Sequence, residues 1–351
     1  MKRRKKTRTV FLCDIPVGGG HPITVQSMTK TLTSDVPSTV KQIRSLQSSG
    51  CEIIRLAVPD QAAAKSLGKI KQAVRIPLIA DIHFDWRLAL EALRQGVHGL
   101  RINPGNIGVK WKIQEVVHAA KDCGVPIRIG VNAGSLERDL LKKYHHPSPE
   151  ALVESAEKHI GILEKFNFSD IKISLKASDV LKTVDAYRLF SKRHRYPLHI
   201  GISEAGPPSQ GIIKSSVGLG ILLSEGIGDT IRVSLTARPE EEVRVAYSIL
   251  GSLGIRRRGI NIISCPTCGR CTIKLRNLVR KIETKLQSIE TPLNVAIMGC
   301  IVNGPGEARE ADIGIAGGKG KGILFKKGRI IKRLKEQDLL DELLSQLENL
   351  Q

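Results

Sequence analysis

Aromatic side chains are scarce in this chain of 351 residues, where Phe, Tyr and Trp together make up 3% of the sequence. Proteins that bind single-stranded nucleic acid stack its bases on such rings, so the scarcity argues against that class. No apolar run approaches the roughly 18 residues of a membrane-spanning helix. The basic start MKRRKKTRTVFL is not followed by the apolar core of a signal peptide. We therefore expect a globular, cytoplasmic protein that does not enter a membrane, and we expect no nucleic-acid partner, with nucleic-acid binding as a rival interpretation.

Acidic residues are also in the minority, with 34 Asp and Glu against 55 Lys and Arg, which gives a formal net charge of +21. Such an excess of cations concentrates anions near the protein. The cysteines do not indicate a disulfide framework, because Cys13, Cys51 and Cys123 are isolated in the sequence and are typical of buried thiols. The other four cysteines all fall in the last third of the chain.

Short strand-like runs alternate with longer segments in which apolar residues recur every three or four positions, as in amphipathic helices. The eight predicted strands are residues 23–28, 53–58, 77–82, 99–103, 126–131, 170–176, 197–203 and 230–235. This order and length predict an α/β fold, a TIM-type (β/α)8 barrel over residues 1–254, with an open doubly wound sheet as the competing fold. The opening stretch VFLCDIPVGGGHPI predicts a hairpin that closes the barrel floor.

Six of these strands carry a basic residue between aliphatic neighbours. These residues are Arg55, Arg101, Arg128, Lys172, His199 and Arg232. Side chains alternate between the two faces of a strand, so if the aliphatic residues pack against the helices, the basic residues point into the barrel. An unpaired buried charge is costly, so each cation needs a local carboxylate, a path to solvent, or a shared ligand. Six equivalent positions favour a polyanionic small molecule, most simply a diphosphate.

Other polar residues stand at or just after the C-terminal ends of the predicted strands, the side on which barrel enzymes place their active sites. They are Asp81, His83, Asn103, Asn106, Asn132, Ser174, Lys176 and Glu204. Asp81 and His83 could also form half of a metal site, but the sequence offers no second histidine pair in a comparable place.

Residues 255–351 form a second predicted domain of small α/β type. Its predicted elements are the strand INIISC, the helix RNLVRKIETKLQSI, the strands LNVAIMG, ADIGIAG and GILFKKG, and the helix KEQDLLDELLSQLENL. The last helix is expected to pack on its own sheet or on another subunit.

Three cysteines stand two residues apart in CPTCGRC, at positions 265, 268 and 271, and Cys300 lies in MGCIVNGPGE. Structural zinc sites usually use two CxxC pairs, and a second pair is missing here. Iron–sulfur clusters accept a compact run with one remote thiolate, so the spacing favours a cluster over zinc and leaves all four cysteines open as ligands. The NGPG turn can return Glu307 towards Cys300, where a carboxylate would be a weakly held ligand of iron.

The sequence resembles a known family, the bacterial and plastid 4-hydroxy-3-methylbut-2-enyl diphosphate synthases of the non-mevalonate isoprenoid route. The motifs that carry the resemblance are PVGGGHPITVQSMTKTLTSDV, GCEIIRLAVP, ADIHFD, GLRINPGN, IGVNAGSL, SEAG, CPTCGR and MGCIVNGPGEA. They span nearly the whole chain, and the last two are highly specific. The resemblance implies a barrel joined to a sulfite-reductase-like iron–sulfur domain in a homodimer, with the cluster of one subunit covering the barrel mouth of the other.

The resemblance also implies roles for individual residues. The ligands of a 4Fe-4S cluster would be Cys265, Cys268, Cys300 and Glu307, with Cys271 a bystander. The substrate contacts would be Arg55, His83, Arg101, Arg128, Asn132, Lys172 and Arg232. Asp81 and Glu204 would lie near the reacting carbons and, with Glu307, are the predicted catalytic residues.

The implied reaction is a two-electron reductive opening of methylerythritol cyclodiphosphate to 4-hydroxy-3-methylbut-2-enyl diphosphate. No nicotinamide or flavin fingerprint is evident in the sequence, so the electrons are expected from ferredoxin or flavodoxin, whose acidic surfaces suit a basic protein. Two rival interpretations remain open. The barrel could be a pteridine-type synthase with structural zinc at the cysteines, or the chain could be a nucleic-acid-binding protein with a zinc module.

Overall fold

The computed structural model describes residues 2–271, 273–286, 289–300, 306, 308–318 and 320–348. The chain divides into two compact units, Met1–Arg256 and Arg257–Gln351. Each unit has its own apolar core.

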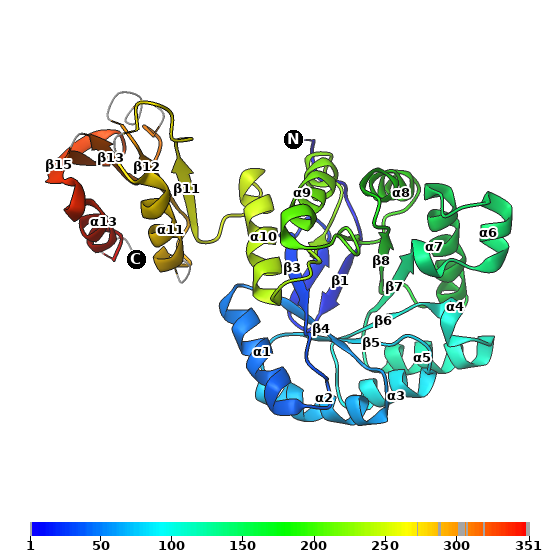
Figure 1. Cartoon of the computed structure of the whole chain (residues 1–351). Helices are drawn as coiled ribbons and strands as arrows, with labels where there is room; N and C mark the ends of the chain where they lie inside the picture. The colour runs from blue at the N-terminus through cyan, green and yellow to red at the C-terminus, as the bar shows by residue number, and fades with distance from the viewer. Residues whose placement is uncertain are drawn as a thin grey trace. The chain divides into compact units, whose positions relative to one another are not determined.

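The first unit contains eight parallel strands, as predicted (Figure 1). They are β3 (Thr24–Met28), β4 (Ile53–Ala57), β5 (Leu78–Asp81), β6 (Gly99–Ile102), β7 (Ile127–Asn132), β8 (Ile171–Lys176), β9 (His199–Ile200) and β10 (Thr230–Ile231). Their order is β8-β7-β6-β5-β4-β3-β10-β9. A parallel bridge between Ile173 and Leu198 joins the two ends of this order. The sheet therefore closes on itself, which confirms the barrel and excludes the open doubly wound sheet.

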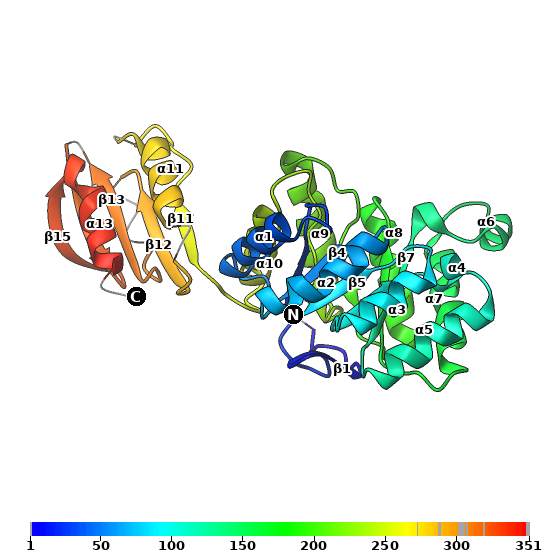
Figure 2. The same ribbon diagram turned by 90° about the horizontal axis from the view of Figure 1, so that it is seen from below.

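Helices surround the strands, as Figures 1 and 2 show. They are α1 (Val36–Ser48), α2 (Gln61–Ala73), α3 (Trp86–Arg94), α4 (Pro104–Ile107), α5 (Lys110–Asp122), α6 (Arg138–Tyr144), α7 (Pro149–Glu164), α8 (Val180–Arg193), α9 (Pro208–Ser224) and α10 (Pro239–Ser252). Several begin at a side-chain cap. Asp35, Asp60 and Asp179, for example, each accept a hydrogen bond from the backbone N–H three residues further on. These local signals explain why the helix starts could be predicted.

A hairpin of β1 (Thr9–Leu12) and β2 (Ile15–Gly18) lies at the N-terminal end of the barrel strands. Leu12 and Val17 of the hairpin pack against Ile53 and Ile79, which point into the barrel from β4 and β5. The predicted hairpin at the barrel floor is thus present, and the open end of the barrel is the opposite one, where the strands finish.

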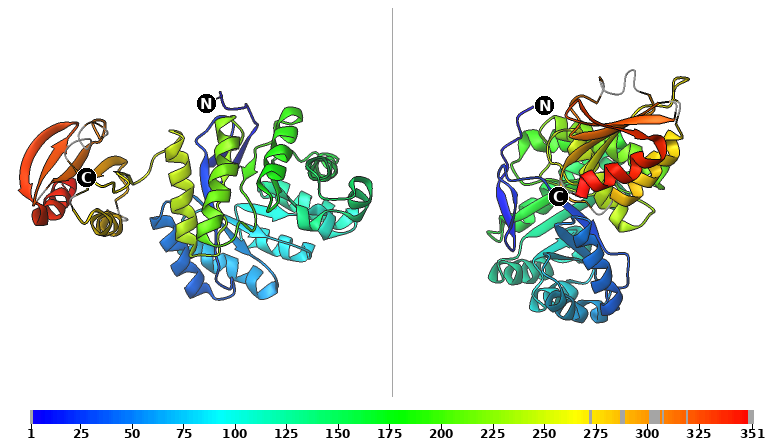
Figure 3. Two further views of the ribbon diagram at one scale, coloured as in Figure 1. Left: turned by 45° about the horizontal axis from the view of Figure 1, so that its top comes forward. Right: turned by 90° about the vertical axis from the view of Figure 1, so that its left-hand side faces the viewer.

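The second unit contains a five-stranded sheet of order β11-β12-β13-β14-β15. The strands are β11 (Ile260–Ser264), β12 (Leu293–Met298), β13 (Ile313–Gly318), β14 (Lys321–Lys326) and β15 (Arg329–Lys335). The helices α11 (Leu275–Leu286) and α13 (Leu339–Glu348) contribute to one apolar core on this sheet (Figure 3). The last helix therefore packs on its own sheet. Sequence reasoning missed β15, because this edge strand is mostly exposed and rich in cations.

Within the described part of the chain, no helix has both the length and the apolar character needed to cross a membrane.

Candidate functional site

Beyond the apolar layer of Ile53 and Ile79 at the floor, basic side chains line the interior of the barrel, where branched aliphatic residues usually fill such barrels. Along β7, Ile127 and Ile129 join the apolar core outside the strands, and Arg128 between them is 2% exposed. Arg128 is the direct neighbour of Arg101 on β6 and of Lys172 on β8. Three cationic side chains thus lie side by side across three adjacent strands.

The remaining predicted cations face the same interior. Arg55 on β4 and Arg232 after β10 each have side chains 13% exposed, and His199 on β9 is fully buried. Burial holds the pKa of Arg128 well below its ordinary value, and the positive charges of Arg55, Arg101 and Arg232 lower it further. The six positions that strand alternation singled out therefore converge on one space.

Among the described residues, Asp81 is one of two carboxylates that form salt bridges with these cations. Its Oδ1 lies 3.1 Å from Nη1 of Arg101, and its Oδ2 lies 3.5 Å from Nε of Arg55 and 3.5 Å from Nε2 of His83. Burial alone would raise the pKa of Asp81, but Arg55, His83 and Arg101 together hold it well below its usual range. Asp81 therefore stays ionised and orients two of the arginines.

Glu242 is the second carboxylate, and sequence reasoning missed it. It comes from α10 and lies 3.7 Å from Nη2 of Arg232 and 3.1 Å from Nζ of Lys30. It also accepts hydrogen bonds from Ser27 at 3.3 Å and from the backbone N–H of Leu235 at 3.0 Å. In the run PEEEVR nothing distinguishes Glu242 from its two acidic neighbours, because only the fold decides which of the three faces the barrel.

Lys176 is a further buried cation of the interior. It follows Lys172 by four residues on β8, so it lies on the same face of the strand, and it is 7% exposed. Burial and the neighbouring guanidinium groups lower the pKa of Lys176 well below its ordinary value. The sequence placed it at a strand end, and strand alternation would have added it to the predicted substrate contacts.

Several polar atoms in this interior have no hydrogen-bond partner among the described residues. They include Nε and Nη1 of Arg128, Nζ of Lys172, both ring nitrogens of His199 and Nε of Arg232. Burial is the main cause that lowers the pKa of Lys172, and it does the same for His199. Buried donors without partners are costly, so this arrangement suits a ligand that supplies several negatively charged acceptors.

The predicted residues at the rim are placed less closely together. His83 is 52% exposed, and its Nε2 lies 3.2 Å from Nη1 of Arg101. Asn132 ends β7 and is half-buried. Glu204 is exposed in the loop after β9, with a left-handed backbone φ of 53°. No hydrogen bond or salt bridge within the described ranges joins Glu204 to the other predicted residues.

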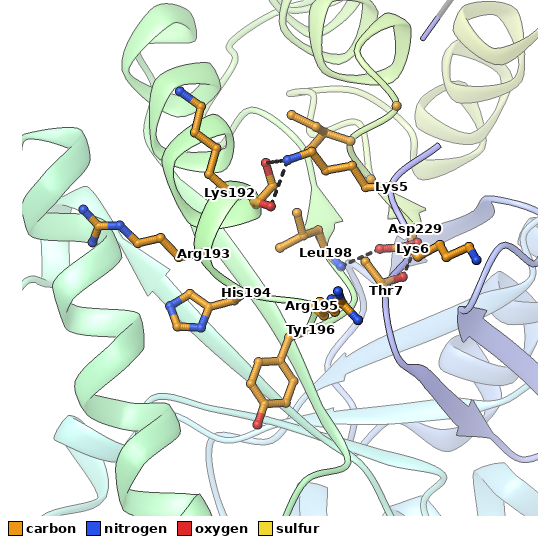
Figure 4. A pocket seen from close by; sticks show the side chains of 14 residues that line it. Lys5, Lys6, Thr7, Lys192, Arg193, His194, Arg195, Tyr196, Leu198 and Asp229 are labelled. Carbon is orange, nitrogen blue, oxygen red and sulfur yellow. Dashed lines mark hydrogen bonds between the residues drawn. The ribbon is translucent and has the colours of Figure 1, made fainter. Parts of the chain in front are cut away.

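A hollow of about 440 Å³ lies at the opposite, N-terminal end of the strands (Figure 4). Lys5 donates from Nζ to the carbonyl oxygen of Ser191 at 2.8 Å, in the last turn of α8. Asp229 lies 2.9 Å from Arg4 and accepts the backbone N–H of Leu198. The charged ends of three lining residues, Lys6, Lys192 and Arg193, extend outward in Figure 4. Lys5 and Arg4 thus attach the N-terminal segment to α8 and to the loop before β10.

The second unit gathers cysteines at the C-terminal ends of two neighbouring parallel strands. Cys265 directly follows β11, and Cys300 comes two residues after β12. The backbone N–H of Gly299 lies 3.3 Å from Sγ of Cys265, and a Cβ built on Gly299 would lie 2.5 Å from Sγ of Cys271. Two of the predicted ligands, Cys265 and Cys300, thus follow the ends of two paired strands, and Sγ of Cys271 lies beside the residue that precedes Cys300.

A sulfur-ligated cluster fits this edge by the chemistry of its donors and by the strand topology. In the described ranges, however, no three His, Cys, Asp or Glu side chains are positioned to hold a metal ion. Cys268 is exposed, and its carbonyl oxygen accepts a hydrogen bond of 2.9 Å from the backbone N–H of Cys271. Glu307, the predicted fourth ligand and catalytic residue, lies outside the described residues.

Fold and site together define a two-domain protein with a cation-lined (β/α)8 barrel and a small thiol-bearing α/β domain. The sequence matches the family models described as the GcpE TIM-barrel domain over residues 7–247 and the GcpE protein C-terminal domain over residues 261–349. The chain belongs to the GcpE family and is an enzyme.

Relatives of this chain carry one shared name, 4-hydroxy-3-methylbut-2-en-1-yl diphosphate synthase (flavodoxin). The protein of that name from Thermodesulfovibrio yellowstonii is 59% identical over 347 residues, which cover 99% of each chain. The one from Geobacter sulfurreducens is 58% identical over 347 residues, covering 99% of this chain and 98% of that one. The likeness therefore extends over both domains.

A solved structure of dihydropteroate synthase from Yersinia pestis also resembles the barrel. It matches with a TM-score of 0.50 at 13% identity and covers 70% of this chain and 98% of that one. At so low an identity the likeness concerns the fold alone, because one barrel fold supports many chemistries.

Proposed function

We propose that this enzyme opens methylerythritol cyclodiphosphate reductively to 4-hydroxy-3-methylbut-2-en-1-yl diphosphate. A carbon–oxygen bond of the ring and a carbon–hydroxyl bond break, two electrons and a proton enter, a carbon–carbon double bond forms between the two carbons, and the hydroxyl leaves as water. The observation that carries the proposal is the barrel interior, where Arg55, Arg101, Arg128, Lys172, Lys176 and Arg232 outnumber the two carboxylates. A cyclic diphosphate would supply the missing negative charge. The names of the relatives support this substrate class.

The residues at the open end of the barrel would orient the substrate. Arg128 and Lys172 would hold the diphosphate with their unpartnered donors, as Asp81 fixes Arg55 and Arg101 beside them. Such pre-set donors stabilise a bound anion without further rearrangement. His83, Asn132 and Glu204 lie nearer the rim, where the carbon end of the ring would sit.

We further propose that Cys265, Cys268, Cys300 and Glu307 hold a 4Fe-4S cluster. When bound, the cluster would transfer single electrons and act as a Lewis acid towards a substrate oxygen. The reductant would be a small one-electron carrier, and the relatives' names support flavodoxin. A cytoplasmic location remains a prediction from the sequence.

The decisive experiment is anaerobic turnover of the cyclic diphosphate by purified protein with an artificial one-electron donor. We expect the linear diphosphate as product, and iron with acid-labile sulfide in the protein. Cys300→Ser should lose both iron and sulfide, whereas Cys271→Ser should keep them. Stoichiometric zinc without iron after the same handling would overturn the proposal. Full turnover by Glu307→Ala would refute the carboxylate ligand even if the cluster were present.

We also propose a homodimer in which one subunit supplies the barrel and its partner the cysteine-bearing domain of each active site. Two inactive variants test this arrangement, Arg128→Met in the barrel and Cys300→Ser in the second unit. After mixing and subunit exchange, a shared site would restore about a quarter of wild-type turnover, because half the dimers are mixed and each has one intact site. A site within a single subunit would restore none.

A further inference from the structure

The helix α11 has one apolar side and one strongly basic side. Leu275, Ile282 and Leu286 are buried against the sheet. The exposed positions of α11 carry Arg276, Arg280, Lys281 and Lys285, and the loop before the helix carries the exposed Arg270 and Lys274. We call these six residues the α11 basic face. Glu283 is the one acidic residue of the helix, and no salt bridge within the described chain neutralises any of the six.

This basic face is continuous with the cysteine loop. Lys274 and Arg276 line a hollow of about 330 Å³ together with Cys268 and Cys271. Cys268 is exposed, so a partner seated on the face would reach the edge of the cysteine site directly. An electron carrier must bring its redox group close to the site that it reduces, and this position meets that requirement.

The opposite edge of the same sheet is a weaker candidate, although it is also basic. Strand β15 carries Arg329, Lys332, Arg333 and Lys335, but Nζ of Lys332 already lies 2.6 Å from Glu342. The sheet order places three strands between β15 and β11, which precedes the cysteine loop. Charge alone is thus shared by both edges, and only α11 combines it with the cysteines.

We propose that the α11 basic face is the docking surface for an acidic one-electron carrier, whose redox group seats over Cys268. The inference rests on the proposed function, because it needs a redox centre at the cysteines. Uncompensated cations attract an acidic partner over several ångströms and orient it before contact, which raises the association rate. Because the attraction acts between solvent-exposed groups, salt screens it.

The test uses the full-length protein, flavodoxin as the probe and the double variant Arg280→Glu/Lys281→Glu. The matched control is Arg329→Glu/Arg333→Glu, which makes the same change in net charge at the opposite edge. Stopped-flow mixing with flavodoxin hydroquinone gives the second-order rate of electron transfer. Fluorescence anisotropy of labelled, oxidised flavodoxin measures binding independently of any cluster.

At low salt we expect the α11 variant to lose about tenfold in the second-order rate and to bind flavodoxin correspondingly more weakly. The difference should shrink at high salt, and the control should behave like wild type. Reduction by a small uncharged donor should be the same in all three proteins, which shows that the site itself is intact.

Equal rates and equal binding for the α11 variant and wild type would refute the docking surface. An equal loss in the control would also refute it, because net charge would then be the cause. If either of these results were found while wild type still turned over the cyclic diphosphate with the small donor, the docking surface would be refuted and the proposed function would be retained. If wild type accepted electrons from neither donor and its α11 face bound random duplex DNA instead, both proposals would fall.

Discussion

Replacing Lys172 by Met should stabilise the ligand-free protein and weaken its hold on the substrate. Lys172 is 1% exposed, and its Nζ has no hydrogen-bond partner among the described residues. The charged group that acts on its pKa, besides burial, is Arg128, which is also cationic. Methionine has a similar length and no charge, so it can occupy the same space in the barrel without an unpaired donor. The substitution therefore separates the destabilisation that a buried lysine causes in the ligand-free protein from its contribution to substrate binding.

The size of the effect is bounded from both sides. A buried lysine can always shed its proton, and neutralising it at pH 7 from an ordinary pKa of about 10.4 costs at most ~4.6 kcal/mol. Replacing buried charged groups by apolar ones of similar volume has stabilised other proteins by roughly 1–4 kcal/mol. We therefore expect a gain of that order for Lys172→Met, or roughly 2–8 °C in Tm at about 2 °C per kcal/mol for a unit of this size.

The substrate should respond in the opposite direction. Loss of one charge-assisted hydrogen bond to the diphosphate removes about 1.5–3 kcal/mol, or roughly 10–150-fold in affinity. Thermal unfolding with and without the cyclic diphosphate measures both effects in one experiment. Lys41→Met, at an exposed position on α1, is the control and should leave Tm and affinity unchanged. A Tm below that of wild type, or undiminished affinity, would refute the reasoning.

Three further predictions concern the same pocket. In Gly130→Ala the new Cβ would lie 2.4 Å from Nε of Arg101 and would displace that side chain, so we expect KM for the cyclic diphosphate to rise about tenfold or more. The control is Gly134→Ala, whose Cβ would meet nothing within 4 Å and which should keep the wild-type KM. Asp81→Asn should lower the denaturant midpoint by the equivalent of ~3–5 kcal/mol, since it leaves two buried cations unpaired. The pKa of Asp81 is depressed, so the stabilisation by its carboxylate is complete above the ordinary carboxyl pKa and is lost only as pH falls through the lower folded pKa. If the difference in unfolding free energy between wild type and Asp81→Asn varied from pH 5 to 8, this reasoning would be contradicted. Burial and nearby cations lower the pKa of Lys176, and a bound diphosphate would raise it again, so binding should take up protons near neutral pH. Calorimetry in two buffers of different ionisation heat measures this uptake, and equal binding heats in both buffers would contradict the prediction.

The predicted cation positions show what a sequence can reveal about a barrel interior. In IRI and IKI the alternation of aliphatic and basic residues is a local signal, and the barrel core has Ile127 and Ile129 outside and Arg128 inside. The same rule, applied one step further, would have included Lys176. Strand alternation depends only on neighbouring residues, so it can be read before the fold is known.

The cysteine edge was harder to predict. The spacing of Cys265, Cys268 and Cys300 indicated an iron–sulfur site, but it could not say that Gly299, the residue after β12, lies against Cys265 and Cys271. That contact depends on β11 and β12 being paired in register, a relation between segments about thirty residues apart.

By itself, the sequence determined the alternating strands and helices, the inward-facing cations and the motifs that relate the chain to its family, because each is a pattern of near neighbours along the chain. Only the tertiary structure decided which carboxylates meet those cations. Asp81 reaches Arg101 across adjacent strands, and Glu242 reaches Arg232 from a surrounding helix. Closure of the barrel also decided that Arg128, Lys172 and His199 would lack an acidic partner among the described residues. Ion pairing depends on distances in space, and these are set when the sheet closes.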